Sequence, residues 1–317
     1  MLTQEEQHSV DELLGNTSVH LTYRRGNKES DNANALLAFA RHLSAHTRGR
    51  ISVLERDGDT PFGDPCLSIG DRIHYMATPE GAEFLPFIEA LSQCDMPREE
   101  ESDLAPAEVL VFTASGCPHC PSAVRTGIDL ALRSPRVSCI VADVQRNQTL
   151  TNRFKVRSVP LTLLDRGMSW TGILSTKDMA EKLRSREAPE FLVELLRSLL
   201  MSARLDEAVS MVLDRDGKAP FSSVWQNSTT QLRIPMMLVV EEVLERSPRT
   251  LDGIIETLGR AVFSEDAALR GDTADLLGQI GHPDGASFVE TLLTDSNPDV
   301  AELAEEILDS LRKPVTD

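Results

Sequence analysis

The sequence of 317 residues lacks several features that define common classes of protein. Aromatic residues make up only 4% of the chain, which leaves few side chains to stack on nucleic-acid bases. No stretch approaches the roughly 18 uninterrupted apolar residues that a membrane-spanning helix requires. The N-terminus also lacks the basic and apolar stretches of a secretory signal. We therefore expect a cytoplasmic protein that does not lie in a membrane.

Basic residues are scarce as well. The chain has 32 Lys and Arg against 50 Asp and Glu, which gives a net charge of −18. Residues 200–317 hold 22 of the acidic residues and only 10 of the basic ones, so the C-terminal third is the acidic part. A surface of this sign repels phosphate backbones and anionic lipids. Nucleic acids and membranes are therefore not expected as partners.

The five cysteines are few and form an odd set, without the dense spacing of a secreted disulfide framework. They are Cys66, Cys94, Cys117, Cys120 and Cys139. Only one pair is close in sequence, in the motif Cys117-Pro118-His119-Cys120. This pair has three interpretations: a redox-active dithiol, half of a zinc site, or two inert thiols. A zinc site needs further ligands, and the sequence has no second Cys-x-x-Cys or Cys-x-x-His, so we expect neither a metal nor a cofactor.

Apolar periodicity predicts two similar α/β segments. After a leading helix at 3–14, residues 1–96 predict strands at 19–23, 51–54, 66–69 and 73–75, with helices from Ser30 or Asp31 to His46 and at 79–92. Residues 97–106 are charged and bracketed by prolines, which is typical of a linker. A second copy follows at 107–187. Its strands are expected at 108–114, 137–144, 161–165 and 168–171, and its helices at 117–133, at 148–154 and after Ser175.

Residues 188–317 lose the strand signals and keep apolar residues at helical spacing. An internal repeat runs through this region. Residues 255–258 recur as 289–292, and the pattern that begins at Leu269 recurs from Val300. Repeats of this length predict an α-solenoid, in which each helix pair buries its apolar face against the next pair. The elements resemble HEAT repeats, and a plain helical bundle is the alternative.

The cysteine pair is expected in surroundings that favour a reactive thiol. The thiolate is the attacking species, so a redox cysteine needs neighbours that stabilise negative charge. Cys117 follows an apolar strand and is expected in the first turn of a helix, near unpaired N–H groups at the positive end of the dipole. Pro118 suits the first helical position, and Cys120 is expected one turn further on. His119 either stabilises the thiolate or is a solvated bystander.

A second motif, Ser158-Val159-Pro160, stands just before the strand expected at 161–165. A strand, Cys-Pro-His-Cys at a helix start, and Ser-Val-Pro before an antiparallel strand together resemble the thioredoxin superfamily over residues 107–187. The resemblance implies that Pro160 is cis and, with Val159 and Pro118, forms the surface that holds the substrate. An ordinary proline at a strand edge is the alternative for Pro160.

The same resemblance implies a role for each residue of the cysteine motif. Cys117 would be the attacking nucleophile, Cys120 the resolving thiol, and His119 the group that tunes the redox potential. One departure concerns a carboxylate. Thioredoxins proper keep a buried Asp where this chain has Val111, which puts thioredoxin-grade reductase activity in doubt.

The first copy carries Arg24-Arg25-Gly26-Asn27 after its first strand, so it has no cysteine there and no dithiol chemistry. Two fused thioredoxin folds with the dithiol only in the second resemble the N-terminal domain of the flavoprotein that reduces alkyl-hydroperoxide peroxiredoxins. They also resemble protein disulfide oxidoreductases of the archaeal type. No Gly-x-Gly-x-x-Gly follows a strand, so no flavin or nicotinamide is expected. Electrons must then pass to or from another protein, a reductase or a peroxiredoxin-type partner.

The sequence thus predicts two tandem thioredoxin-like folds, at 1–96 and 107–187, followed by an all-α HEAT-like unit at 188–317. The expected function is a protein-disulfide reductase or isomerase whose helical repeat binds disulfide-containing client proteins. The alternative is a redox-sensitive adaptor or holdase in which the dithiol is a switch or a relic. Cys139 is expected in the core. Cys66 is expected to be buried too, and a third redox thiol is the other possibility.

Overall fold

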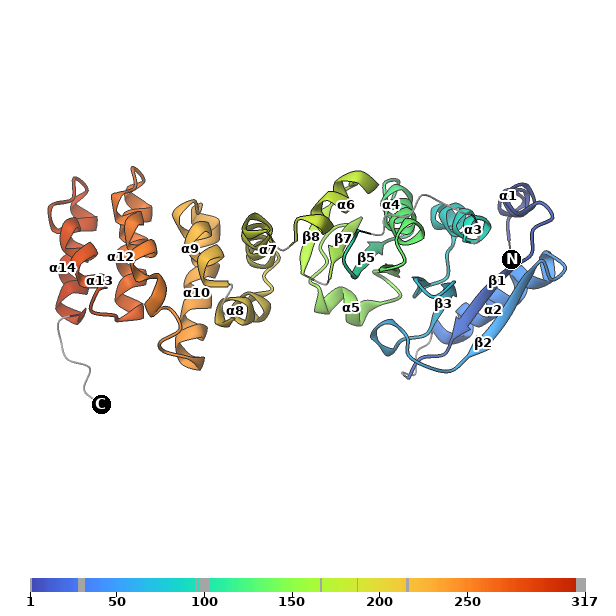
Figure 1. Ribbon diagram of the computed structural model, residues 1–317, viewed down its shortest axis with the longest axis horizontal. Helices are drawn as coiled ribbons and strands as arrows, with labels where there is room; N and C mark the ends of the chain where they lie inside the picture. Colours follow the sequence, from blue (N-terminus) through green and yellow to red (C-terminus); the bar gives the residue numbers. More distant parts are fainter. Residues whose placement is uncertain are drawn as a thin grey trace. The chain divides into compact units, whose positions relative to one another are not determined.

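The structure, a computed structural model, describes residues 2–27, 32–94, 96, 103–165, 167–186, 188–214 and 217–311. They belong to two compact units, Met1–Arg186 and Glu187–Asp317. Unit 1 is α/β and unit 2 is all-α, which confirms the predicted fold class (Figure 1). Most of the linker expected at 97–106 and the start of the helix expected from Ser30 or Asp31 lie outside the described residues.

The first half of unit 1, residues 2–94, opens with α1 (Gln4–Leu14), where Thr3 and Glu6 cap the helix reciprocally. Strand β1 pairs in parallel with β2 and antiparallel with β3, and β3 is antiparallel to β4. The helix expected at 79–92 begins later, after a short 3-10 turn. The remaining elements are β1 (Val19–Arg24), α2 (Asn32–His46), β2 (Ile51–Arg56), η1 (Pro61–Gly63), β3 (Cys66–Ile69), β4 (Ile73–Tyr75), η2 (Gly81–Glu83) and α3 (Phe84–Gln93).

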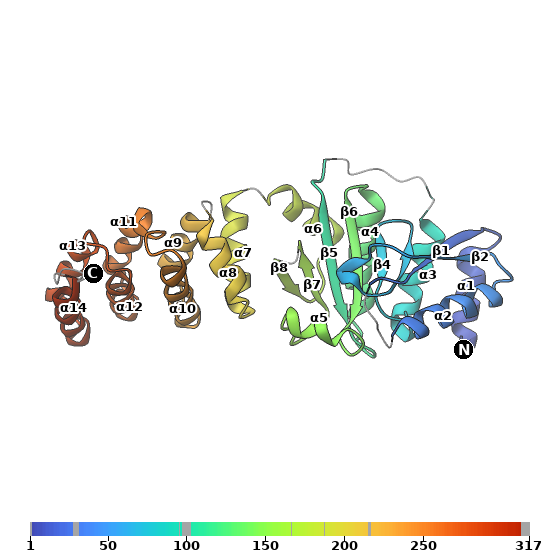
Figure 2. The ribbon, with the colours of Figure 1, turned by 90° about the horizontal axis from the view of Figure 1, so that it is seen from below.

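The second half, residues 103–186, has the same strand order. Strand β5 is parallel to β6 and antiparallel to β7, and β7 is antiparallel to β8. Residues of β4 and β6 also pair in parallel, which joins the two halves into one eight-stranded sheet in the order β2-β1-β3-β4-β6-β5-β7-β8 (Figure 2). The elements are β5 (Ala107–Thr113), α4 (Cys120–Arg133), β6 (Val137–Asp143), α5 (Gln148–Arg153), β7 (Leu161–Leu164), β8 (Met168–Thr171) and α6 (Thr176–Arg184).

Strand β5 is buried on both faces of the sheet. Val109 and Val111 face α4, where Gly127 lets the helix lie close to them: a Cβ on this glycine would be 2.9 Å from the sulfur of Cys139. On the other face, Phe112 packs with α5 in a core that also contains residues of the first half. Burial on both sides explains why the sequence of β5 is continuously apolar rather than alternating.

Helix α4 begins at Cys120 and not at Cys117, which corrects the sequence-based expectation. The Ala123 amide donates a hydrogen bond of 3.4 Å to the carbonyl of His119, the N-cap residue of α4. Pro118 and Pro121 both suit a helix start, and in the structure it is Pro121 that lies in the first turn of α4, where its missing donor costs little.

The helices of unit 2 form two layers. Helices α7, α9, α11 and α13 contact one another in succession, and so do α8, α10, α12 and α14 (Figure 2). The sequence repeat follows this arrangement, since Leu269 and Val300 are buried in successive helices of the second layer. The bounds are α7 (Pro189–Met201), α8 (Leu205–Leu213), α9 (Lys218–Gln226), α10 (Thr230–Arg246), η4 (Asp252–Ile254), α11 (Ile255–Gly259), η5 (Arg260–Phe263), α12 (Ala267–Ile280), α13 (Gly285–Glu290), η6 (Thr291–Thr294) and α14 (Pro298–Leu311).

Ion pairs connect successive helix pairs of unit 2. Arg233 on α10 is 2% exposed and lies 3.0 Å from Asp266, the N-cap residue of α12. Arg270 on α12 lies 2.6 Å from Asp295, in the segment before α14. Both arginines stand at the fourth position of their helix. The two contacts are therefore a repeated feature of the stack.

Candidate active site

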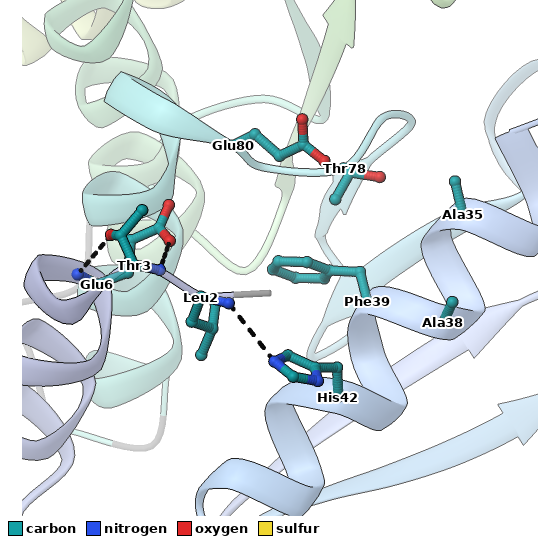
Figure 3. A pocket seen from close by; sticks show the side chains of 9 residues that line it. All are labelled: Leu2, Thr3, Glu6, Ala35, Ala38, Phe39, His42, Thr78 and Glu80. Carbon is teal, nitrogen blue, oxygen red and sulfur yellow. Dashed lines mark hydrogen bonds between the residues drawn. The ribbon is translucent and has the colours of Figure 1, made fainter.

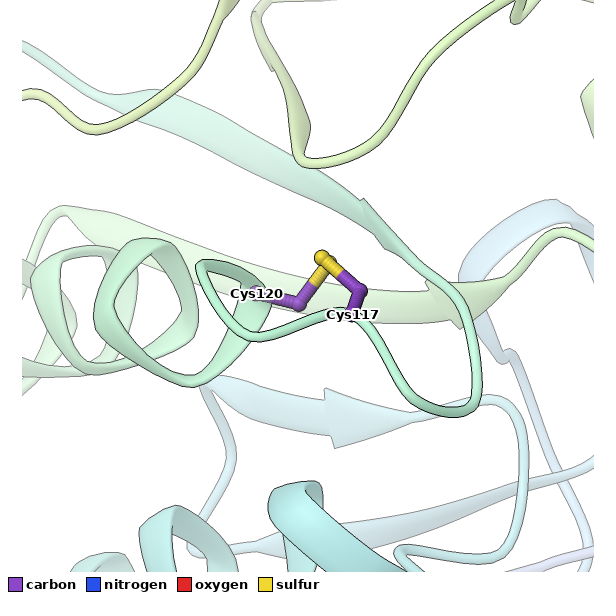
Figure 4. Close-up of a disulfide and its surroundings, with 2 residues drawn as sticks. All are labelled: Cys117 and Cys120. Atoms are coloured by element: carbon purple, nitrogen blue, oxygen red, sulfur yellow. A yellow bond between two sulfur atoms is a disulfide. The ribbon is translucent and has the colours of Figure 1, made fainter.

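Cys117 and Cys120 form a disulfide, and their Cα atoms are 5.5 Å apart (Figure 4). Cys120 is the first residue of α4 and is 0% exposed, whereas Cys117 lies in the preceding loop and is only partly buried. A reacting molecule therefore reaches Cys117 first. The N–H groups of the first turn of α4 lie closer to Cys120, so the helix dipole acts less directly on Cys117 than its expected helical position implied.

The two residues between the cysteines are exposed. Pro118 and His119 both lie at the surface of the loop. His119 is the N-cap residue of α4, but its side chain makes no capping hydrogen bond. The imidazole is therefore accessible to a molecule that approaches Cys117. This position is compatible with tuning of the thiolate and equally with the solvated alternative.

The Val159–Pro160 peptide bond is cis, as the resemblance implied. Pro160 is buried and Val159 is partly buried against the core on the α5 face of the sheet. Leu161 pairs with Phe112 in the antiparallel register of β7 and β5. This register places Pro160 beside Thr113, at the edge of the sheet from which the cysteine loop leaves.

A carboxyl group from the first half lies behind the cysteine loop. Glu83, at the end of η2, lines a cavity of about 170 Å³ together with Thr113 and Ser115. Burial raises the pKa of Glu83 to about 7, while the positive charge of Arg125 on α4 opposes this shift. Within the described residues, neither carboxylate oxygen of Glu83 has a hydrogen-bond partner.

Other polar groups lie around Glu83, and Tyr75 among them is buried. Tyr75, the last residue of β4, is 1% exposed, and among the described residues its hydroxyl has no hydrogen-bond partner. Burial, and after it the charge of Glu83, raise the pKa of Tyr75. Arg125 lies 2.6 Å from Glu89 of α3, and this ion pair connects the helices of the two halves. A carboxyl with an elevated pKa therefore stands in a polar pocket at the junction of the halves.

Sequence reasoning missed Glu83. The only signal in the sequence was the apolar Val111 at the position where thioredoxins proper keep an Asp. That signal shows only that β5 lacks this carboxylate, and it does not point to Glu83. Glu83 stands in the other half of unit 1, and the pairing of β4 with β6 brings it to the site.

The other thiols lie apart from the disulfide. Cys139 is 0% exposed, as expected, and burial raises the pKa of its thiol to about 12. Cys66 is also 0% exposed, and burial raises the pKa of its thiol. Its sulfur lies 3.5 Å from the hydroxyl of Ser68, which lies 2.9 Å from Nδ1 of His74. Across the described ranges, no group of His, Cys, Asp or Glu side chains suits a metal ion.

Comparisons with known proteins match the second half in one case and a longer part of the chain in others. Residues 107–184 match the family model of the thioredoxin domain. The chain is similar to the N-terminal domain of the alkylhydroperoxide reductase AhpF from Enterococcus faecalis, with 16% identity, a TM-score of 0.48, and coverage of 58% of this chain and 100% of that one. It is also similar to a protein disulfide oxidoreductase from Aeropyrum pernix, with 15% identity, a TM-score of 0.48, and coverage of 58% and 93%. No curated protein matches the chain.

The fold and the site together define a class. The β6-β5-β7-β8 order, the cis proline before β7 and the bonded cysteine pair at the start of α4 are the features of a thioredoxin-like fold in the second half. The family match spans the same residues, from β5 to the end of α6. No helix in the described part of the chain has the length and apolar character to cross a membrane.

Proposed function

We propose that this protein is a thiol–disulfide oxidoreductase that reduces or isomerises disulfides of client proteins in the cytoplasm. The observation that carries the proposal is the bonded pair in which Cys117 is accessible and Cys120 is 0% exposed. An accessible thiolate can attack a client, while a buried neighbour within bonding distance can displace the client afterwards.

The proposed reaction has two exchange steps. The Cys117 thiolate attacks one sulfur of the client disulfide, which forms a mixed disulfide and releases the other client sulfur as a thiolate that takes up a proton. The Cys120 thiol then loses its proton, and its thiolate attacks the sulfur of Cys117. The Cys117–Cys120 disulfide forms, and the second client sulfur leaves as a thiolate. Two electrons pass to the client, so a reductase or another dithiol protein must reduce the pair again.

In this proposal Glu83 accepts the proton of Cys120. A buried thiol gives up its proton reluctantly, because its charged form is poorly solvated. Helix α4, which starts at Cys120, contacts η2, which ends at Glu83. A general base works best when its pKa is close to the working pH. The pKa of about 7 for Glu83 meets that condition, and its carboxylate oxygens are not occupied by other described groups.

The substrate backbone is proposed to lie against Val159, Pro160 and Pro118. Pro160 stands beside the end of β5, and Pro118 is exposed next to Cys117, so both border the accessible sulfur. His119 is proposed to tune the redox potential, because an exposed imidazole near the loop stabilises a thiolate when it is protonated or donates a hydrogen bond.

Unit 2 is proposed to bind clients. Its second layer exposes apolar side chains at Ile234 and Leu238 of α10, on the same helix as the exposed Glu241 and Glu245. The same observation favours the second candidate function, an adaptor or holdase in which binding by unit 2 is the main activity and the dithiol is a switch or a relic. The HEAT-like character of the repeat remains a proposal.

Reduction of a protein disulfide by the full chain separates these candidates. An oxidoreductase reduces the client catalytically and loses this activity in Cys117→Ser, while Cys120→Ser accumulates a mixed disulfide with the client. Cys94→Ser is the matched control, because Cys94 is a thiol at the end of α3 outside the disulfide. If the wild-type chain binds clients but exchanges no disulfide, the adaptor is the better description.

A further inference from the structure

Two cavities of unit 1 share part of their lining. The cavity of about 170 Å³ behind the cysteine loop includes Ser115, two residues before Cys117. A larger cavity of about 550 Å³ lies between the N-terminal residues and α2 (Figure 3). Thr78 and Glu80 line both of them. The two cavities therefore adjoin at Thr78 and Glu80, the smaller one reaching Ser115 beside the cysteine loop and the larger one reaching α2, and together they are called the groove below.

The groove is acidic near its middle. Glu80 lies where the two cavities meet, Glu83 and Asp143 line the smaller one, and Glu6 lines the larger one. The Glu6 carboxylate already accepts a hydrogen bond from the Thr3 amide. The opposing charge is Arg146 in the smaller cavity, and His42 lines the larger one next to the Leu2 amide. Carboxylates therefore outnumber the basic groups along the groove.

The far end of the groove is apolar. Ala35 and Ala38 of α2 are exposed, and the Phe39 ring points from the helix into the larger cavity (Figure 3). This ring is held from behind by edge contacts with Phe84 and Phe87, with centroids 6.4 and 5.9 Å away. A fixed aromatic ring between small residues is a suitable floor for an aliphatic side chain.

One buried polar group also points to an occupant. Tyr75 lines the smaller cavity, its side chain is 1% exposed, and its buried hydroxyl has no hydrogen-bond partner among the described residues. Buried hydroxyl groups are normally hydrogen-bonded. A polar group of a bound molecule in this cavity would supply the missing partner.

We propose that this groove binds the stretch of the client chain that flanks its reacting cysteine, and that it selects a basic side chain at Glu80 and an aliphatic one against Phe39. The proposal rests on the proposed oxidoreductase function, since it names the client of the same site. An extended segment of this kind would run from Cys117 along the groove. The first half thereby contributes specificity to a reaction that it does not carry out.

The test uses the full chain, reduced beforehand, and two synthetic peptides. Each peptide carries one cysteine as a mixed disulfide with mercaptoethanol, flanked by Lys and Leu in one peptide and by Glu and Leu in the other. The protein is oxidised to its disulfide while the peptide thiol and mercaptoethanol are released. The wild-type chain is expected to react with the basic peptide about tenfold faster, as for complementary charges at a binding surface.

Glu80→Lys is expected to abolish or reverse this ratio of rates. Because both peptides are tested on the same protein sample, partial loss of folded protein does not change the ratio. The matched control is Glu12→Lys, a charge reversal at an exposed position of α1 that does not line either cavity. At the apolar end, Ala38→Trp should slow the Lys-Leu peptide relative to a Lys-Gly peptide. Ala45→Trp, at another exposed position of α2, should leave that ratio unchanged.

Two results would overturn the inference. Equal rates for the basic and acidic peptides in the wild-type chain, or a ratio unchanged by Glu80→Lys, would show that the groove does not select the client. Both results leave the proposed function intact, because disulfide exchange still occurs. If neither peptide nor a protein disulfide is reduced at all, the proposed function fails, and the groove proposal fails with it.

Discussion

The two halves of unit 1 share a strand order but differ at the loop after the first strand. In the second half this loop carries Gly116 and then Cys117, and in the first half it carries Gly26 and then Asn27. Both glycines have positive φ, +79° and +68°. A Cβ on Gly116 would meet nothing within 4 Å, whereas one on Gly26 would be 2.5 Å from the carbonyl oxygen of Gly63. The loop is open in one half and covered in the other.

The segment that covers Gly26 is η1, and it also contacts the second half. In the first half, η1 stands where the second half has α5, and the Phe62 ring of η1 packs against Phe154 with centroids 6.0 Å apart. The first half thus has a covered loop and makes contacts with the second half. The comparison teaches that a half without the cysteine pair can still lie against the half that has it, and the proposed roles of Glu83 and of the groove beside Glu80 depend on that arrangement.

The largest expected effect concerns the accessible cysteine. Cys117→Ser should lower disulfide exchange by about a thousandfold or more, because the attacking thiolate is removed. The measurement is the rate of reduction of a protein disulfide by the full chain. Cys94→Ser should retain the wild-type rate. Exchange that survives in Cys117→Ser would contradict the role of Cys117 as the attacking thiol.

The next effect tests the carboxyl that the first half supplies. Glu83→Gln should slow resolution of the mixed disulfide by about tenfold and remove a rise in rate with pH centred near 7, because the ionised carboxylate is the proposed base. The measurement is a pH profile of the single-turnover rate. A profile that keeps its inflection in Glu83→Gln would assign the proton transfer to another group.

Stability gives a second readout for the same variant. The pKa of Glu83 is raised in the folded state from an ordinary 4.5 to about 7, so ionisation between these values favours the unfolded state. The contribution of protonated Glu83 to the free energy of unfolding is therefore lost as the pH rises from 4.5 to about 7. Glu83→Gln should raise the melting temperature relative to wild type at pH 8 more than at pH 4. Equal shifts at both pH values would contradict the burial of an ionised carboxylate.

A matched pair of substitutions tests the covered and open loops. Gly26→Ala should cost about 2–4 kcal/mol, because the new Cβ combines positive φ with a contact too short for backbone atoms. Gly116→Ala should cost only about 1–2 kcal/mol, from the positive φ alone. Urea denaturation of both variants measures the difference. Equal losses of stability in the two variants would show that η1 does not restrain the loop at Gly26.

The smallest effect is expected for the buried thiol of the first half. Cys66→Ala should leave the rate of disulfide exchange within about twofold of wild type, because burial keeps the thiol protonated and out of reach. A trapped intermediate that involves Cys66, detected by mass spectrometry of the oxidised chain, would instead make it a third redox thiol.

Much of the fold follows from local sequence patterns. The order of strands and helices, the leading helix at 3–14 and the two-copy pattern were predicted, because each depends on neighbouring residues or on a short apolar period. The start of α4 was wrong, because Pro118 and Pro121 both suit a helix start, and the choice between them depends on how the loop leaves β5. The roles of His119 and Val159 stay predictions.

What the sequence by itself determined is the cysteine pair: its spacing is local, and few other functions need two thiols three residues apart after an apolar strand. What only the tertiary structure decided is which parts of the first half lie near the cysteine loop. Glu83 and Glu80 line the cavity that includes Ser115, Phe39 lines the adjoining cavity, and the pairing of β4 with β6 joins the first half to the sheet. The physical reason is that burial and charge at a site depend on contacts between distant segments, which leave no periodic signal in the chain.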